Sequence, residues 1–210
     1  MGVDDASRSD TRDFVESSLI SAGVPAAFLD RDGVLNDVHL VYGVPHPPSS
    51  PSELELLPLV IEACQTLHAA GIRLVVVTNQ PDIARGTTTR AAVDEINDEL
   101  RRVLPLTDVV VCPHDDTDGC GCRKPRPGMI LDAAAKHGIA LGRSVMVGDR
   151  WRDIAAGRAA GVANVFVDHN YDERRPIGHD LTVRGLHEAT SFILNWARKD
   201  DSSHGTDKRS

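Results

Sequence analysis

An apolar run stops at a pair of carboxylates in the stretch Ala26-Ala27-Phe28-Leu29-Asp30-Arg31-Asp32-Gly33. The four apolar residues predict a short buried strand, and the glycine allows the chain to turn sharply as it leaves that strand. In an alternating backbone, Asp30 and Asp32 point to the same side. The stretch therefore predicts two carboxyl groups close together at the end of a strand.

The rest of the chain alternates between apolar runs and segments with helical spacing. Strands are expected at residues 26–29, 72–77, 108–112, 144–147 and 163–167, and helices at 58–70, 88–104, 127–137, 151–160 and 186–198. This pattern indicates the α/β class, with a Rossmann-like parallel sheet covered by helices on both faces. Such sheets bind ligands beyond the carboxyl ends of their strands. Asp30, Thr78 and Asp149 follow strands directly or nearly so, and we expect them to meet at that edge.

Length and charge narrow the class of protein. The chain has 210 residues, enough for one domain with a hydrophobic core, and a formal net charge of −8 argues against non-specific binding to nucleic acid or an anionic membrane. No apolar run could span a bilayer and the acidic N-terminus is unlike a signal peptide, so we expect a cytoplasmic protein. We also expect a monomer.

We divide the chain into three parts. They are a partly disordered N-terminal extension (1–24), in which residues 10–22 could form a short helix, one domain (25–198) and a disordered tail (199–210).

The residues expected at the sheet edge suit phosphoryl transfer. A carboxylate can attack phosphorus to form an aspartyl-phosphate, and a second carboxyl can protonate the leaving oxygen and then deprotonate water. Because clustered carboxylates repel one another and repel phosphate, Asp30 and Asp32 call for a hard divalent cation, and Mg²⁺ completed by Asp149 is the natural choice. The phosphoryl oxygens could be stabilised by the Thr78 hydroxyl, the Asn79 backbone and Lys124.

Three of the four cysteines lie close together in the chain, beside a histidine. In a cytosolic protein this clustering indicates metal binding rather than disulfides. Three thiolates and one imidazole make a full tetrahedral zinc set, supplied by Cys112, His114, Cys120 and Cys122. Because no ligand position stays open to water, the zinc is expected to be structural and to hold Arg123 and Lys124 against the substrate phosphate. The alternative is a group of reduced surface thiols.

Together these motifs resemble the haloacid dehalogenase superfamily of phosphatases. The resemblance lies in four blocks, in the order of that family: Asp30-Arg31-Asp32-Gly33, Val77-Thr78-Asn79-Gln80, Arg123-Lys124-Pro125 and Gly148-Asp149-Arg150-Trp151-Arg152-Asp153. It implies that Asp30 is the nucleophile and that Asp32 is the general acid/base, which also binds the metal through its backbone carbonyl. It further implies that Thr78 and Lys124 stabilise the phosphate, and that Asp149 binds the metal with support from Asp153.

A narrower resemblance covers residues 26–167. The segments Thr78-Asn79-Gln80, Ile83-Ala84-Arg85-Gly86 and the cysteine loop through Arg123-Lys124-Pro125 look like the family of D-glycero-D-manno-heptose-1,7-bisphosphate 7-phosphatases and histidinol-phosphate phosphatases. This resemblance implies a capless enzyme, with catalytic Mg²⁺ and structural Zn²⁺. It also implies a small phosphorylated substrate, most readily the heptose bisphosphate, bound by Asn79, Gln80, Arg123 and Arg150.

Other functions could use related residues. A phosphatase for histidinol phosphate or another small phosphate ester would apply the same chemistry to a different alcohol. A signalling receiver domain also forms an aspartyl-phosphate, but its phospho-acceptor lies on a later strand and it has no zinc loop. An inactive scaffold held by zinc would not need the complete set of site residues. The Pro-rich segment 45–51 is either an irregular linker or a loop that contacts the substrate.

Overall fold

The computed structural model describes residues 23–41 and 44–199. The helix expected at residues 10–22, nearly all of the N-terminal extension, and the tail from residue 200 lie outside the described residues. None of the described helices has both the length and the apolar character needed to cross a membrane.

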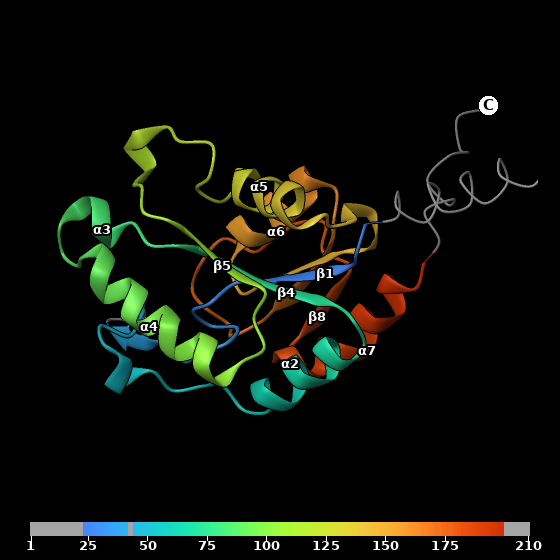
Figure 1. Ribbon diagram of the computed structural model, residues 1–210. Helices are drawn as coiled ribbons and strands as arrows, with labels where there is room; N and C mark the ends of the chain where they lie inside the picture. Colours follow the sequence, from blue (N-terminus) through green and yellow to red (C-terminus); the bar gives the residue numbers. More distant parts are fainter. Residues whose placement is uncertain (1–22, 42–43, 200–210) are drawn as a thin grey trace, which may run out of the picture.

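Six parallel strands form the central sheet (Figure 1): β1 (Ala26–Leu29), β4 (Arg73–Asn79), β5 (Asp108–Cys112), β6 (Val145–Gly148), β7 (Ala163–Val167) and β8 (Leu181–Val183). Their order is β5-β4-β1-β6-β7-β8. The chain winds from β1 toward β5 in its first half and from β6 toward β8 in its second, so the winding reverses between β1 and β6. This is the doubly wound, Rossmann-like sheet predicted from the sequence, and its ligand crevice lies at that reversal.

Helices cover both faces of the sheet, as predicted (Figure 1). One face packs against α2 (Val60–Ala69), α7 (Leu186–Ala197) and the C-terminal part of α4 (Arg90–Val103), and the other against α5 (Gly128–His137) and α6 (Trp151–Ala160). Within β1, Ala27 and Leu29 join the first layer whereas Phe28 joins the second, and all three side chains are fully buried. Burial on both faces explains why the strands are continuously apolar.

The helix ends follow the signals in the sequence. Helix α4 begins after Thr89, whose hydroxyl accepts a hydrogen bond from the Ala92 N–H at 3.1 Å. Helix α5 begins after Pro127 and ends at Gly138, which has a left-handed φ of 61°. A capping hydroxyl at the start and a glycine at the end satisfy backbone groups that have no partner within the helix.

A short excursion separates β1 from α2. It contains an antiparallel hairpin, β2 (His39–Val41) and β3 (Val44–His46), and a 3₁₀ turn at Pro51–Glu53. Two backbone hydrogen bonds close its base, from Asp37 N–H to Glu55 O at 2.8 Å and from Leu57 N–H to Leu35 O at 3.0 Å. A hairpin of this size is too small to be a separate domain, in keeping with the predicted capless fold.

The remaining elements are short, and the sequence did not predict them. They are α3 (Asp82–Arg85), the edge strand β8, and 3₁₀ turns at Asp116–Asp118 and Leu141–Arg143. Each spans only three or four residues, too few to show a period of 3.6 or 2.

Candidate active site

One cleft, of about 350 Å³, lies at the carboxyl edge of the sheet. Asp30 follows β1, Thr78 lies near the end of β4 and Asp149 follows β6, so the cleft is at the winding reversal. It brings together every residue predicted for phosphoryl transfer and substrate binding: Asp30, Asp32, Thr78, Asn79, Gln80, Arg123, Lys124, Asp149, Arg150 and Asp153. Its size suits a small-molecule ligand.

Lys124 is the only lysine among the residues that line this cleft, and it is almost fully buried. Its ammonium donates to Asp30 Oδ1 at 2.8 Å and to the Val77 carbonyl at 2.7 Å, and it pairs with Asp153 Oδ1 at 2.5 Å. Burial opposes its charge, but the carboxylates of Asp153 and Asp30 raise the pKa of Lys124 above its usual value. Lys124 is therefore a fixed positive charge beside Asp30.

Three buried carboxylates surround one point in the cleft. Asp30, Asp149 and Asp153 each present an oxygen within 4.8 Å of the others. Burial raises the pKa of Asp30 to about 7, despite the opposing effect of Lys124, and burial together with Asp30 raises the pKa of Asp149. The buried Oδ1 of Asp149 has no hydrogen-bond partner among the described residues.

This donor set fits a hard divalent cation. Buried carboxylates with an unpartnered oxygen are costly unless a positive charge compensates them, and oxygen ligands are those that Mg²⁺ prefers. Asp153 is already engaged, because its Oδ1 pairs with Lys124 and its Oδ2 accepts the Arg150 N–H at 2.9 Å. Asp30 and Asp149 are the side chains left to bind the ion.

Two glycines allow the turns to approach this closely. A Cβ on Gly33 would lie 2.2 Å from Asp149 Oδ2, and Gly33 has a left-handed φ of 86°. A Cβ on Gly148 would lie 2.1 Å from the Asp153 Cβ. Any side chain at Gly33 or Gly148 would therefore push a carboxylate out of place.

Asp32 lies beside this group, held by neighbouring donors. Arg31 places Nε and one terminal nitrogen on its two oxygens, each at 3.1 Å. Asn36 donates to Asp32 Oδ1 at 3.0 Å, and Gln80 donates to Asp32 Oδ2 at 2.8 Å. The Asp32 side chain keeps 17% of its surface exposed. It is therefore fixed in orientation and still reached from the cleft.

The four predicted substrate-binding residues also hold the site together. The Asn79 side-chain amide pairs with the Lys124 backbone in both directions, at 3.0 and 3.1 Å. Gln80 bridges Asp32 and the Thr78 hydroxyl, which is 2.9 Å away. Arg123 donates to the His114 carbonyl and to Asp116, and Arg150 forms a two-point ion pair with Glu173. Their contact with a substrate stays a prediction.

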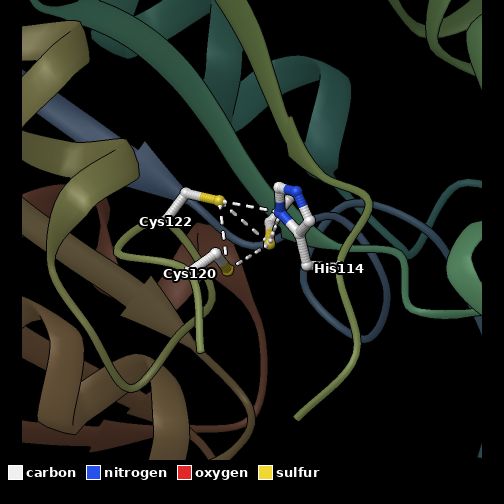
Figure 2. A group of neighbouring side chains, drawn as sticks. His114, Cys120 and Cys122 are labelled. Carbon is white, nitrogen blue, oxygen red and sulfur yellow. Dashed lines mark hydrogen bonds between the residues drawn. The ribbon is translucent and has the colours of Figure 1, made fainter. Parts of the chain in front are cut away.

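The predicted zinc ligands converge at the end of β5. Figure 2 shows the side chains of His114, Cys120 and Cys122 pointing toward one another. The Cys122 sulfur lies 3.3 Å from His114 Nδ1, 3.5 Å from the Cys120 sulfur and 3.2 Å from the Cys112 sulfur. A tetrahedral zinc with the usual bond lengths separates its ligand atoms by about 3.5 Å. Burial raises the pKa of Cys112 to about 12, a cost that bound metal would remove by stabilising the thiolate.

Several residues near the site were not predicted. Arg31 is fully buried, and its guanidinium also donates to Asn97 of α4 at 3.1 Å. His169 is half-buried and donates to the Gly33 carbonyl at 2.7 Å. Tyr171 lies beside Asp149, and burial together with that carboxylate raises the pKa of its phenol. Only Arg31, inside the Asp30–Gly33 motif, carried a signal of its role.

The arrangement of these groups defines a class of enzyme. A parallel sheet carries paired aspartates at the end of β1, a buried lysine and a further aspartate after β6. Residues 49–161 match the haloacid dehalogenase-like hydrolase family, and the chain belongs to this family, as a phosphatase.

Its similarity to individual members is more specific. The chain is 39% identical to the D-glycero-beta-D-manno-heptose-1,7-bisphosphate 7-phosphatase of Mesorhizobium japonicum, over 80% of this chain and 79% of that protein. It is 36% identical to the enzyme of the same name from Yersinia pestis, over 84% of this chain and 93% of that protein. The crystal structure of D,D-heptose 1,7-bisphosphate phosphatase from B. bronchiseptica, complexed with magnesium and phosphate, covers 81% of this chain and 98% of its own, with a TM-score of 0.69 and 31% identity.

Proposed function

We propose that this chain is a Mg²⁺-dependent phosphatase that removes the 7-phosphate of D-glycero-D-manno-heptose 1,7-bisphosphate. The observation that carries the proposal is the buried group of Asp30, Lys124 and Asp149 in one cleft, in a chain similar over about four fifths of its length to enzymes of that name. The B. bronchiseptica neighbour, which contains magnesium and phosphate, supports the choice of ion.

The chemistry follows from the positions of the side chains. An Asp30 oxygen attacks the substrate phosphorus, the bond from phosphorus to the sugar oxygen breaks, and Asp32 gives its proton to that oxygen. Asp32 then takes a proton from water, which attacks the phosphorus of the aspartyl-phosphate and releases inorganic phosphate and free Asp30. Thr78 and Lys124 stabilise the phosphoryl oxygens, because both groups are held before substrate arrives.

Mg²⁺ would be held by Asp30, Asp149 and the backbone carbonyl of Asp32, with Asp153 in support. When bound, it supplies positive charge that lets a carboxylate approach a phosphate group. Zn²⁺ would be held by the cysteine loop and would be structural. Its proximity to Arg123, which donates to the His114 carbonyl at 3.2 Å, supports the proposal that it orders this side of the cleft.

The substrate's sugar and second phosphate would be bound at the mouth of the cleft. Arg123 and Arg150 contribute positive charge to the lining of the cleft, to which His46 and Pro47 from the hairpin region also belong. This placement favours a substrate-contact loop over an irregular linker for the Pro-rich segment. Guanidinium groups suit a phosphate because they can bind two of its oxygens at once.

We further propose that the protein acts as a monomer in the cytoplasm. The close group of Cys112, Cys120 and Cys122 sulfurs, none in a disulfide, supports a reducing compartment. Size-exclusion chromatography with light scattering tests the monomer.

A phosphate-release assay with matched substrates tests the activity. We expect the heptose 1,7-bisphosphate to give a kcat/KM at least about tenfold above that of histidinol phosphate or common sugar monophosphates, only in the presence of Mg²⁺. Asp30→Asn should abolish turnover, whereas Asp132→Asn, at an exposed position on α5, should leave it unchanged. Turnover by Asp30→Asn at the wild-type rate would refute the nucleophile, and preference for histidinol phosphate would refute the substrate.

A further inference from the structure

A loop of residues 168–180 connects β7 to β8 and passes beside the carboxylate group. Its backbone is fixed by contacts of its own. The Asp168 N–H donates to the Val183 carbonyl at 2.8 Å, and the Asp168 carboxylate accepts the Asn170 N–H at 2.9 Å. Arg175 places two nitrogens on the same carboxylate, at 2.9 and 2.7 Å. These contacts within the connection give the loop a defined shape.

The first contact of this loop with the site runs through His169. Its Nε2–H donates to the Gly33 carbonyl at 2.7 Å, across 136 positions of sequence. Gly33 is the residue whose missing Cβ leaves room for the Asp149 carboxylate. By holding the turn at Gly33, His169 holds the backbone that contacts the Asp149 carboxylate.

The second contact runs through Tyr171. Its ring lies 5.4 Å from the His169 ring, and both residues line one small pocket together with Asp149. Tyr171 does not line the catalytic cleft, whereas Asp149 lines both the cleft and this small pocket. The same loop then places Glu173 on Arg150, the residue after Asp149. The loop thus contacts both turns that carry the proposed metal ligands.

We propose that the β7–β8 loop pre-orients the metal site, with His169 and Tyr171 as positioning residues for Asp149. The inference rests on the proposed Mg²⁺ site at Asp30 and Asp149. A carboxylate held in one orientation by neighbouring residues loses less freedom when the ion binds, and removal of such supporting residues commonly lowers metal affinity by roughly 10- to 100-fold.

The proposal is tested by measuring the binding of Mn²⁺ to zinc-loaded, full-length protein without substrate. The electron paramagnetic resonance signal of free Mn²⁺ reports how much of the ion stays unbound. We expect Tyr171→Phe, which removes one oxygen, to weaken Mn²⁺ binding by about tenfold. His169→Ala should weaken it similarly, and His169→Gln, which keeps a side-chain N–H, should restore part of the loss. The matched control is His179→Ala, because His179 lies in the same connection but contacts Thr182 and Phe166.

The outcomes distinguish a failure of the proposed metal site from a failure of the positioning role. If the wild-type protein binds no Mn²⁺, the metal site of the proposed function is wrong. If the wild type binds Mn²⁺ but Tyr171→Phe and His169→Ala bind it equally well, the positioning role is wrong. If His179→Ala weakens binding as much as His169→Ala does, loss of loop stability explains the effect and the positioning role is again wrong. Should His169→Ala fail to fold, Tyr171→Phe and His169→Gln decide the result.

Discussion

Replacing Gly33 by alanine should separate backbone strain from damage to the metal site. A residue with a side chain at φ 86° loses about 1–2 kcal/mol of stability, equivalent to roughly 2–8 °C in Tm for a chain of this size. The added Cβ also meets Asp149 Oδ2 at 2.2 Å, so the carboxylate must move by about 1 Å to reach an ordinary contact of roughly 3.3 Å. A misplacement of about 1 Å in a catalytic group can cost roughly 100-fold in rate.

Gly71 provides the control for this experiment. It has a similar φ of 80°, but a Cβ there would meet nothing within 4 Å. Both variants should therefore lose stability in thermal unfolding through the left-handed φ, whereas only Gly33→Ala should lose about 100-fold in kcat/KM in the phosphate-release assay. Wild-type activity in Gly33→Ala, or an equal loss in Gly71→Ala, would refute the reasoning.

Three further predictions concern other parts of the molecule. Purified protein should contain one zinc per chain by elemental analysis, and Cys120→Ser should lose the zinc and unfold at lower temperature, because the loop would lose its metal ligands. Asn97→Ala leaves a nitrogen of the buried Arg31 without a partner and should cost about 1–3 kcal/mol in urea unfolding. Partial burial opposes ionisation of Asp108, but the hydrogen bond from His137 and its other donors lower its pKa to about 2. Its carboxylate thus stabilises the fold above pH of about 4 and loses this effect as the pH falls toward 2, so Asp108→Asn should cost less than about 1 kcal/mol at pH 6 and progressively less in acid urea titrations.

The sequence predicted the sheet and the residues that meet at its edge because both depend on local patterns. Asp30, Thr78 and Asp149 each sit at the end of an apolar run, and parallel strands bring those ends together whatever the separation along the chain. The zinc cluster was predictable for a similar reason, since its four ligands lie close in sequence.

The supporting contacts could not be predicted from local patterns. Arg31 contradicts the general rule that arginine stays solvated, and its buried guanidinium donates to Asn97 of α4, 66 positions away in the sequence. His169 and Tyr171 lie in a polar loop without periodicity, and their partners are distant in sequence. The hairpin was missed because its strands are three residues long and Pro45, which has no N–H to donate, lies in one of them.

The excursion over residues 38–54 leaves and rejoins the fold at adjacent points, closed by the hydrogen bonds from Asp37 to Glu55 and from Leu57 to Leu35. The reacting groups belong to the sheet edge, whereas His46 and Pro47 of this segment border the cleft. Part of the cleft lining is thus contributed by a stretch of the chain that carries none of the proposed reacting groups. Because the segment is joined to the fold at one place, grafts from other phosphatases are expected to change the substrate range while leaving the proposed reacting groups in position.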